Sequence, residues 1–424
     1  MRMQGMQKKA IIIIMAAMLM APVWAGAAEV VFPVSGYTPE ELAKVREWEK
    51  TWVGKKIDQT NIDQVAQFLP ENIVGMYKDP DNWGAGPDGL YFYISPYKQI
   101  IETKGMIEAT KKYSPLVKTD AEGLITNSAD LAGFPFPDPK TGLELANNYE
   151  FQTRGDTYSY RWKCPSSDPR ARTDRLADQQ FEELFFFHRV DVDPRPALPK
   201  NSKGYLKGQF LEFNKPPEMQ NSRLIVMKFM DETKEYESHL YYAEFRRIRR
   251  ISQAERTNAI DGTDMIYDDG NQWDGYISRN TYNYKGRKEM LLTRHVDMRK
   301  LTRSPGQIMP NNMNYERCNT HVVEVVSKTP RYLYSKRIWY MDPETYYIGW
   351  QEVWDQVGQY WKCFLQNNGD VKMVNGEMKS FLVGFEMTDF QRKHGGFSDQ
   401  SDVQHIGKKI SPKTYSLTNL QRSY

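Results

Sequence analysis

Six histidines in this 424-residue chain are the side chains best suited to metal binding or acid–base catalysis. None is followed by a second histidine four residues later, so the sequence contains no H-E-x-x-H zinc motif. No G-x-S-x-G nucleophile motif accompanies them. We therefore expect no catalytic residue, no metal site and no cofactor, and interpret the six as surface or hydrogen-bonded core residues: His188, His239, His295, His321, His394 and His405.

A short stretch rich in Asp and Gly offers oxygen ligands of the kind that calcium prefers. Its spacing does not match an EF-hand loop, and the glutamate that ends such a loop is missing. Nothing in the sequence supports a carboxylate pair for glycoside hydrolysis. Because Asp and Gly are common in tight turns, we interpret the stretch as a turn. Its aspartates are Asp261, Asp264, Asp268 and Asp269.

The densest run of charge is formed by Arg246, Arg247, Arg249 and Arg250. On a strand, alternate arginines point to opposite faces, so at least one would face inward. On a helix, the neighbouring apolar residues would share a stripe and leave the arginines in solvent. An inward arginine needs an anionic partner, because an unpaired buried charge is costly. We expect ion pairs with Glu244 and the nearby aspartates, or contact with a ligand headgroup or an acidic partner.

Three cysteines, Cys164, Cys318 and Cys363, are too few and too far apart for a disulfide scaffold or a C-x-x-C redox motif. Two alternatives remain open: two of the cysteines form a disulfide and the third stays a thiol, or all three are buried thiols. Residues 84–89 match the dinucleotide pattern G-x-G-x-x-G. The prolines at Pro80 and Pro87 make this segment a turn-rich loop instead of a strand-to-helix junction, so we do not expect it to bind a cofactor.

Residues 1–27 have the order of a secretory signal peptide: basic, then apolar, then small. The apolar run is shorter than the ~20 residues that span a bilayer, and we expect cleavage after Ala27. Removal would take away three of the 57 basic residues and leave 54, equal to the number of acidic residues. We therefore predict a periplasmic protein that lacks the basic excess that nucleic-acid binding needs.

The elements that must position these residues are a few helices followed by many strands. Charged residues make up 26% of the chain and aromatic residues 13%, which excludes a polytopic membrane protein and a disordered chain. We predict helices over Pro39–Trp52, Ile62–Phe68 and Tyr97–Tyr113, and an extended Pro-rich segment over 133–139. From Tyr149 onward strand patterns dominate without βαβ alternation.

These patterns predict a chain in four parts. They are a signal peptide at 1–27, an N-terminal helical segment at 28–130 that packs on a sheet, an antiparallel β-sheet or half-barrel domain at 131–390, and a partly extended C-terminal tail at 391–424.

The clearest strand signal runs from Tyr332 to Leu365, where two tight turns join three strands into an antiparallel meander. Both faces of these strands carry aromatic residues, so each face needs a cover of helices, another sheet or a ligand. We predict that apolar residues of this sheet line a ligand cavity. The predicted lining consists of Val226, Phe229, Tyr242, Ile338, Trp339, Tyr340, Trp350, Trp354 and Trp361.

Five motifs of the sequence resemble those of the DUF1329 family of exported bacterial proteins. They are Gly133–Pro137 with Gly142 and Asn147, Arg246–Arg250 before Asp268-Asp269, Tyr284–Met290, Tyr334–Thr345 and Trp354–Trp361. The resemblance extends over nearly the whole chain after residue 27. It implies a fold similar to outer-membrane lipoprotein-sorting (LolA/LolB-like) proteins, with helices over the concave face of a curved antiparallel sheet. It also implies RND-type transporters and outer-membrane proteins as partners, and it supplies no catalytic residues.

The combined prediction is a β-rich α+β fold, a half-open β-barrel that carries a lipid or another hydrophobic compound to or from the outer membrane. Adaptable Met and aromatic side chains suit such a ligand. A second hypothesis is a periplasmic adaptor that binds protein partners, which predicts a large exposed aromatic patch. A third is a hydrolase acting on lipid or polysaccharide, which would need converging Asp, Glu, Ser or His side chains. We expect a non-enzymatic protein.

Overall fold

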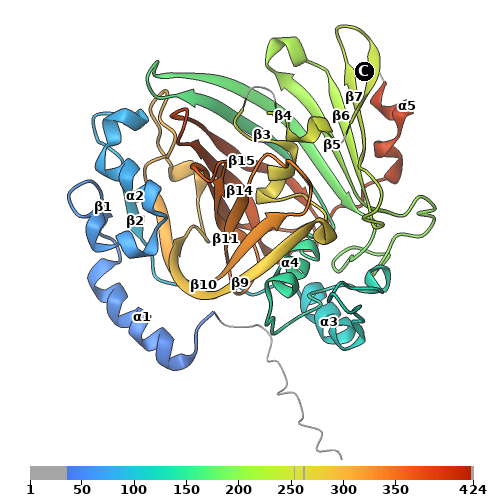
Figure 1. The fold of residues 1–424 in the computed structure, drawn as a ribbon, viewed down its shortest axis with the longest axis horizontal. Helices are drawn as coiled ribbons and strands as arrows, with labels where there is room; N and C mark the ends of the chain where they lie inside the picture. The colour runs from blue at the N-terminus through green and yellow to red at the C-terminus, as the bar shows by residue number, and fades with distance from the viewer. Residues whose placement is uncertain (1–35, 253, 261–262, 422–424) are drawn as a thin grey trace, which may run out of the picture. The chain divides into compact units, whose positions relative to one another are not determined.

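In the computed structural model, the strands of the described residues form one mostly antiparallel sheet (Figure 1). The structure describes residues 36–252, 254–260 and 263–421, which lie in the compact unit Phe32–Tyr424. The predicted signal peptide at 1–27 lies outside the described residues. The strand order is β1-β2-β10-β11-β12-β13-β14-β15-β3-β4-β5-β6-β7-β8, and β9 pairs with β10. The β-rich α+β fold predicted from the sequence is confirmed.

The strands are long in the centre of the sheet and short at both ends. Antiparallel pairing prevails, and β2 pairs with β10 in parallel. Their bounds are β1 Lys56–Ile57, β2 Phe92–Ile94, β3 Thr157–Asp168, β4 Thr173–Phe185, β5 Tyr205–Lys215, β6 Arg223–Phe229, β7 Glu237–Tyr242, β8 Arg247–Ile251, β9 Asn280–Leu292, β10 Met313–Ser327, β11 Lys336–Met341, β12 Ile348–Trp354, β13 Tyr360–Lys372, β14 Met378–Asp389 and β15 His394–Ile406.

The helices precede the long strands, apart from a short one near the C-terminus. They are α1 Pro39–Trp52, α2 Glu71–Lys78, α3 Lys104–Tyr113, α4 Gly142–Glu150 and α5 Leu417–Leu420. The first predicted helix is confirmed, and Thr38 and Glu41 form a reciprocal capping box at its start. The second predicted helix is instead two 3-10 turns, Ile62–Gln64 and Ala66–Phe68, and α2 follows Pro70.

The predicted third helix begins later than its pattern suggested. Residues 97–103 are irregular, and α3 starts where Thr103 caps it by accepting a hydrogen bond from the Met106 backbone amide at 3.2 Å. The meander is confirmed as β11, β12 and β13, with antiparallel register on both sides of β12.

The segment predicted as a partly extended C-terminal tail at 391–424 contains a strand in the middle of the sheet. Strand β15 pairs with β14 on one side and with β3 on the other, so it joins the two halves of the sheet. The segment is rich in Gly, Ser, Asp and Gln, so its sequence does not show the pattern that is typical of a strand. Small and polar residues are tolerated in β15 because larger side chains on the adjacent strands β14 and β3 supply the packing.

The two faces of β10–β13 are both covered, as the aromatic pattern predicted. On one face, Tyr340, Trp350 and Leu365 pack in a core with residues of α1 and α2. On the opposite face, Trp339 and Met341 pack with residues of α3 and α4. Strands β10 and β11 therefore lie between two layers of helix, whereas Val353 of β12 and Phe364 of β13 belong to a third core.

The other half of the sheet, β3–β7, separates its faces by strict alternation. One face carries a core that includes Tyr160, Phe181 and Val226, and the opposite face carries a core in which Leu184 and Ile225 pack against Tyr415 and Leu420 near α5. The first of these faces is called the inner face below. Its cover is the segment 263–279, made of loops and 3-10 turns between β8 and β9. The predicted helical cover is thus found over β10 and β11, whereas irregular chain covers the inner face of β3–β7.

Candidate functional site

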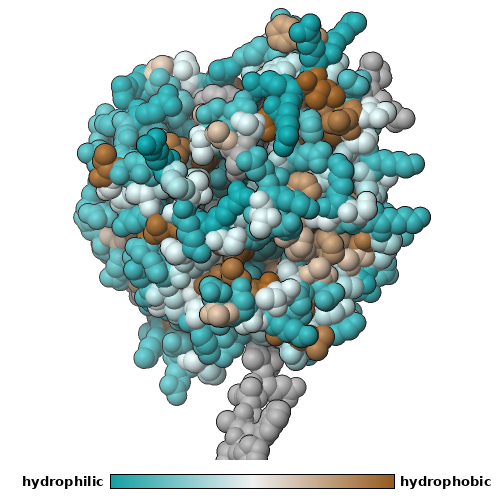
Figure 2. Space-filling view, turned by 45° about the vertical axis from the view of Figure 1, so that its right-hand side comes forward, coloured by the Kyte–Doolittle hydropathy of each residue, from teal (hydrophilic) through white to brown (hydrophobic). Residues whose placement is uncertain are grey.

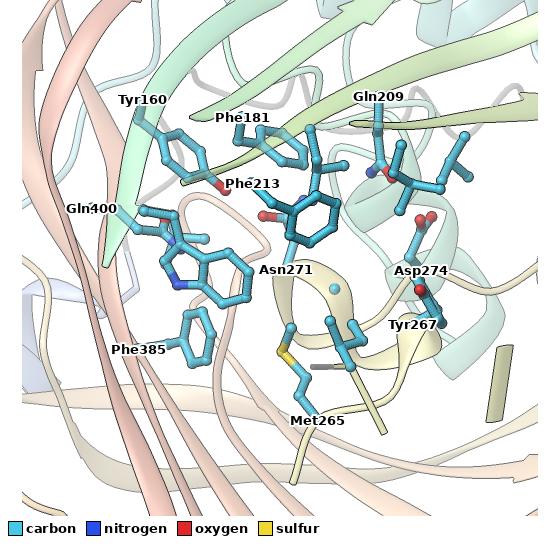
Figure 3. Close-up of a pocket in the computed structure, with 17 residues that line it drawn as sticks. Tyr160, Phe181, Gln209, Phe213, Met265, Tyr267, Asn271, Asp274, Phe385 and Gln400 are labelled. Carbon is cyan, nitrogen blue, oxygen red and sulfur yellow. The ribbon is translucent and has the colours of Figure 1, made fainter. Parts of the chain in front are cut away.

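A cavity lies between the inner face of the sheet and residues 263–274, with Ile260 also in its wall (Figure 3). It contains about 670 Å³ of space between atoms when its opening to solvent is included, and the cavity itself has a volume of about 80 Å³, below the roughly 300–1,000 Å³ that is usual for small-molecule sites. Both β6 and β14 contribute to its wall, although four strands separate them in the sheet. A flat sheet would hold them more than 20 Å apart at ~4.8 Å per strand, so the inner face must curve around the cavity. The residues that line it are Tyr160, Trp162, Phe181, Gln209, Leu211, Phe213, Leu224, Val226, Ile260, Met265, Tyr267, Gly270, Asn271, Asp274, Leu382, Phe385 and Gln400.

The cavity wall is apolar at the level where β3, β4, β5 and β6 pair through Tyr160, Phe181, Leu211 and Leu224. The rings of Tyr160 and Phe181 are stacked, with centroids 5.0 Å apart and planes 14° apart. Trp162 lies two residues further along β3 and contacts Phe385, with ring centroids 6.0 Å apart. The result is a flat aromatic surface that presents apolar area to the cavity.

The wall becomes polar where Gln209, Asn271 and Asp274 line it. Tyr158 and Glu183 adjoin Gln209 on the same face without lining the cavity, two residues further along the strands. There Tyr158 pairs with Glu183, Glu183 with Gln209, and Gln209 with Val226. The Glu183 carboxylate accepts hydrogen bonds from the Tyr158 hydroxyl at 2.7 Å and from Gln209 Nε2 at 2.6 Å. The cavity therefore has an apolar length and a polar end, as an amphiphilic ligand would need.

Behind the polar end lies a buried ionic cluster, which we call the floor: Glu150, Arg154, Glu183, Lys207, Lys228 and Asp274. Lys207 Nζ lies 3.4 Å from Glu183 Oε2 and 3.2 Å from Asp274 Oδ1. Lys228 Nζ lies 2.6 Å from Glu150 Oε1 and 3.7 Å from Asp274 Oδ1. Arg154 interacts electrostatically with Glu183 and donates to the Tyr149 hydroxyl at 3.2 Å. Three acids and three bases leave the floor formally neutral.

The floor holds Asp274 in its charged form. Burial would raise the pKa of this carboxyl, but the positive charges of Lys207, Lys228 and Arg256 outweigh it and lower the pKa to about 2. Burial raises the pKa of Glu150 in spite of Lys228 beside it. The floor is thus an internally compensated ionic structure and does not present a free charge to the cavity.

The aspartates first considered as calcium ligands anchor the segment 263–279 through ion pairs. Asp269 Oδ1 lies 2.7 Å from Arg337 Nη1, and its Oδ2 accepts the Tyr334 hydroxyl at 2.9 Å. Asp268 pairs with Arg256 at 3.0 Å. Asp264 pairs with Arg392 at 3.1 Å and with His394. Asp261 lies outside the described residues. Each described aspartate thus has a basic partner.

Of the nine residues predicted to line a cavity, Val226 lies in this one. Ile338, Tyr340 and Trp350 pack in the core shared with α1 and α2, and Trp339 packs in the core shared with α3 and α4. Tyr242 and Trp361 are half-buried beside the inner-face core. Phe229 lines two shallower surface grooves, and Trp354 lies half-buried with its ring 5.3 Å from that of Tyr360. A role for these eight in ligand binding stays a prediction.

The arginine run forms the edge strand β8, with Arg246 in the turn before it. Arg246, Arg247, Arg249 and Arg250 are exposed, and Arg249 pairs with Glu255. Ile248 and Ile251 pack on opposite faces of the sheet. The strand alternative therefore applies, but the sheet edge lets the long side chains reach solvent.

The cysteines and histidines are placed as structural residues. Cys164, Cys318 and Cys363 are buried free thiols, which resolves the disulfide question in favour of three separate thiols. Burial lowers the pKa of His188 to about 3, and its ring stacks on Phe151 with centroids 3.6 Å apart. Burial also lowers the pKa of His321 to about 3. Within the described residues, no group of three or more His, Cys, Asp or Glu side chains could hold a metal ion.

Sequence reasoning did not select the aromatic wall of the cavity. Its signal was present as Tyr158, Tyr160 and Trp162, which alternate along one strand and therefore share a face. The segment that closes the cavity carries no comparable signal, because Met265 and Tyr267 lie in irregular chain without a period.

Comparisons with known proteins place this geometry in a family context. The pattern of the family described as "Protein of unknown function (DUF1329)" matches residues 56–421. An uncharacterized protein of Pseudomonas aeruginosa is 25% identical over 319 residues, which cover 72% of this chain and 67% of that protein.

Two solved structures show a partial likeness to this chain. A DUF1329 family protein from Desulfovibrio piger has 12% identity, a TM-score of 0.49 and coverage of 66% of this chain and 97% of its own. A LolA superfamily protein from Nitrosomonas europaea has 11% identity, a TM-score of 0.39 and coverage of 66% of this chain and 100% of its own. Within the described residues, no helix has the length and apolar character that crossing a bilayer requires.

Proposed function

We propose that this chain, which belongs to the DUF1329 family, binds and carries a lipid or another hydrophobic compound in the cavity on its inner face. The observation that carries the proposal is the composition of the cavity wall. Apolar side chains at alternate positions of β3, β5 and β6 point into one curved space that ordinary core packing has not filled. A purely structural core would be packed to the density of an organic crystal.

The energetics suit a carrier. Burial of about 300 Å² of apolar ligand surface supplies roughly 7 kcal/mol before the entropic cost of association. After that cost the net free energy falls below the ~8.2 kcal/mol of a micromolar complex, so this contact alone gives weak binding that permits release. The surroundings of the cavity support uptake without reaction: the nearest acids and bases are committed to one another in the floor, so we propose a non-enzymatic role.

We place this activity in the periplasm, on the basis of the signal-peptide pattern at residues 1–27. An RND-type transporter and an outer-membrane protein are the partners we propose for delivery and release. The adaptor hypothesis has less support. The exposed large hydrophobic residues belong to separate elements, and on the face shown in Figure 2 apolar side chains form small patches among hydrophilic ones.

A cavity-filling variant tests the proposal. N-phenylnaphthylamine, an uncharged fluorescent probe, should bind the full chain with enhanced fluorescence, and Val226→Trp should weaken binding at least tenfold by occupying the cavity. The matched control is Val374→Trp, because Val374 is 64% exposed and lies outside the cavity. Circular dichroism checks that both variants fold.

A direct measurement complements the probe. Native mass spectrometry and solvent extraction of protein purified from its own periplasm should detect a bound apolar molecule. Absence of both a bound molecule and probe binding would overturn the carrier proposal.

A further inference from the structure

The cavity offers a hydrogen-bonding group that no described residue uses. Tyr160 is 5% exposed, and none of the hydrogen bonds among the described residues involves its hydroxyl. In Figure 3 this hydroxyl points from β3 toward the interior of the cavity, near Phe213 and Asn271. A hydroxyl that faces a cavity and has no partner among the described residues can donate a hydrogen bond to, or accept one from, a bound ligand.

The charges around the cavity limit what that ligand can be. Asp274 is the one charged residue among the described residues of the cavity wall, and Lys207 and Lys228 compensate it at 3.2 and 3.7 Å. No lysine or arginine is among the described residues of the lining, so an ionised carboxylate or phosphate would meet no counter-ion from them. An ammonium group would meet an aspartate whose charge is already paired.

We infer that the cavity selects an uncharged lipid that carries a hydroxyl or carbonyl group, and that Tyr160 determines this specificity by hydrogen-bonding that group. The apolar part of the ligand lies against the stacked rings of Tyr160 and Phe181 and against Trp162. The inference rests on the proposed function and adds the chemical class of the ligand.

Three amphiphiles with one chain length and different head groups test the inference. 1-Dodecanol, dodecanoate and dodecylamine are compared at neutral pH, below micelle formation, as competitors of N-phenylnaphthylamine on the full chain. We expect 1-dodecanol to displace the probe at a concentration about tenfold or more below that of either charged competitor, because a charged head would be desolvated without compensation. Equal or better competition by dodecanoate or dodecylamine would overturn the inference.

The variant Tyr160→Phe tests the role of the hydroxyl. It should weaken the binding of 1-dodecanol about threefold to tenfold, because one hydrogen bond is lost. The dissociation constant of the probe should stay within twofold of the wild-type value. The matched control is Tyr241→Phe, because Tyr241 packs on the opposite face of the sheet. An unchanged affinity of Tyr160→Phe for 1-dodecanol would contradict the assignment of Tyr160.

These results separate the two proposals. If the probe does not bind the wild-type chain, the proposed function fails. If the probe binds but the competitors show no preference for the uncharged head group, the carrier proposal stands and the specificity inference fails.

Discussion

Glu386 on β14 is a buried carboxyl without a basic partner, unlike the acids of the floor. Its Oε1 accepts a hydrogen bond from Asn367 Nδ2 at 2.8 Å, and its Oε2 has no partner among the described residues. Burial raises its pKa to about 8. The side chain is therefore protonated in the folded protein over a pH range in which it ionises in the unfolded chain.

This residue should make the protein less stable as the pH rises. Between the unfolded pKa near 4.5 and the folded pKa near 8, the folded state binds the proton that the unfolded state releases, so stability falls with pH. Replacing Glu386 with Gln removes this penalty, and we expect the stabilisation to grow by about 3 to 5 kcal/mol across that range. Denaturant unfolding at several pH values measures it.

The exposed Glu122 provides the control, since Glu122→Gln should shift the unfolding free energy little at any pH. A gain for Glu386→Gln that does not vary with pH would contradict the proposed protonation state.

At the scale of elements, the segment 263–279 depends on ion pairs because it has no regular hydrogen-bond ladder of its own. Asp269 and Arg337 are both buried, and their pair connects the segment to β11. Asp269 Oδ2 also accepts the Ile266 backbone amide at 3.0 Å, which fixes the local turn. The sequence predicted a turn here, and the structure adds that the turn closes a cavity.

Removing Asp269 should loosen this segment. Asp269→Asn leaves the Arg337 guanidinium buried without a carboxylate, and we expect the unfolding free energy to fall by about 3 to 5 kcal/mol. Amide hydrogen exchange should rise first in residues 263–274. The double variant Asp269→Asn/Arg337→Met should recover part of the loss, because it also removes the unpaired charge.

Glu47→Gln is the matched control, since Glu47 and Lys50 form a pair in which both side chains are over 70% exposed. We expect it to change stability by less than about 1 kcal/mol. If Asp269→Asn behaves like Glu47→Gln, the anchoring role of the pair is wrong.

At the scale of the whole molecule, the position of β15 makes the sheet depend on the last part of the chain. Strand β15 connects β14 to β3, whereas these two strands have no pairing with each other. The inner-face core draws residues from both sides of this connection, including Tyr160 on β3 and Phe385 on β14. The cavity therefore exists because the chain returns to the middle of its own sheet.

A truncation series checks this dependence. Ending the chain after Phe390 removes β15 and should prevent native folding, because two sheet edges and the inner-face core become exposed. Ending it after Ser416 removes the buried Leu420 and should cost about 2 to 5 kcal/mol while retaining the fold. Soluble yield, circular dichroism and probe binding distinguish the two, and a folded, probe-binding chain without β15 would contradict this account of the sheet.

The sequence by itself determined the family, the β-rich α+β fold, helix α1 and the β11–β13 meander. These features have local causes: the capping box at Thr38 and Glu41, and alternating aromatic residues with tight turns between strands. The aromatic content of both faces of these strands also follows from a period of two residues, which is a property of one strand alone.

Only the tertiary structure decided which apolar face remains unfilled. Trp339, Trp350 and Trp162 are all aromatic residues of strands. Helices cover the first two, whereas an irregular segment covers the third. Covering elements come from distant parts of the chain, and pairing across the sheet likewise placed β15 between β14 and β3. Local patterns state that a face is apolar; packing between distant segments decides whether that face becomes core or cavity, because it sets how much of the space is occupied.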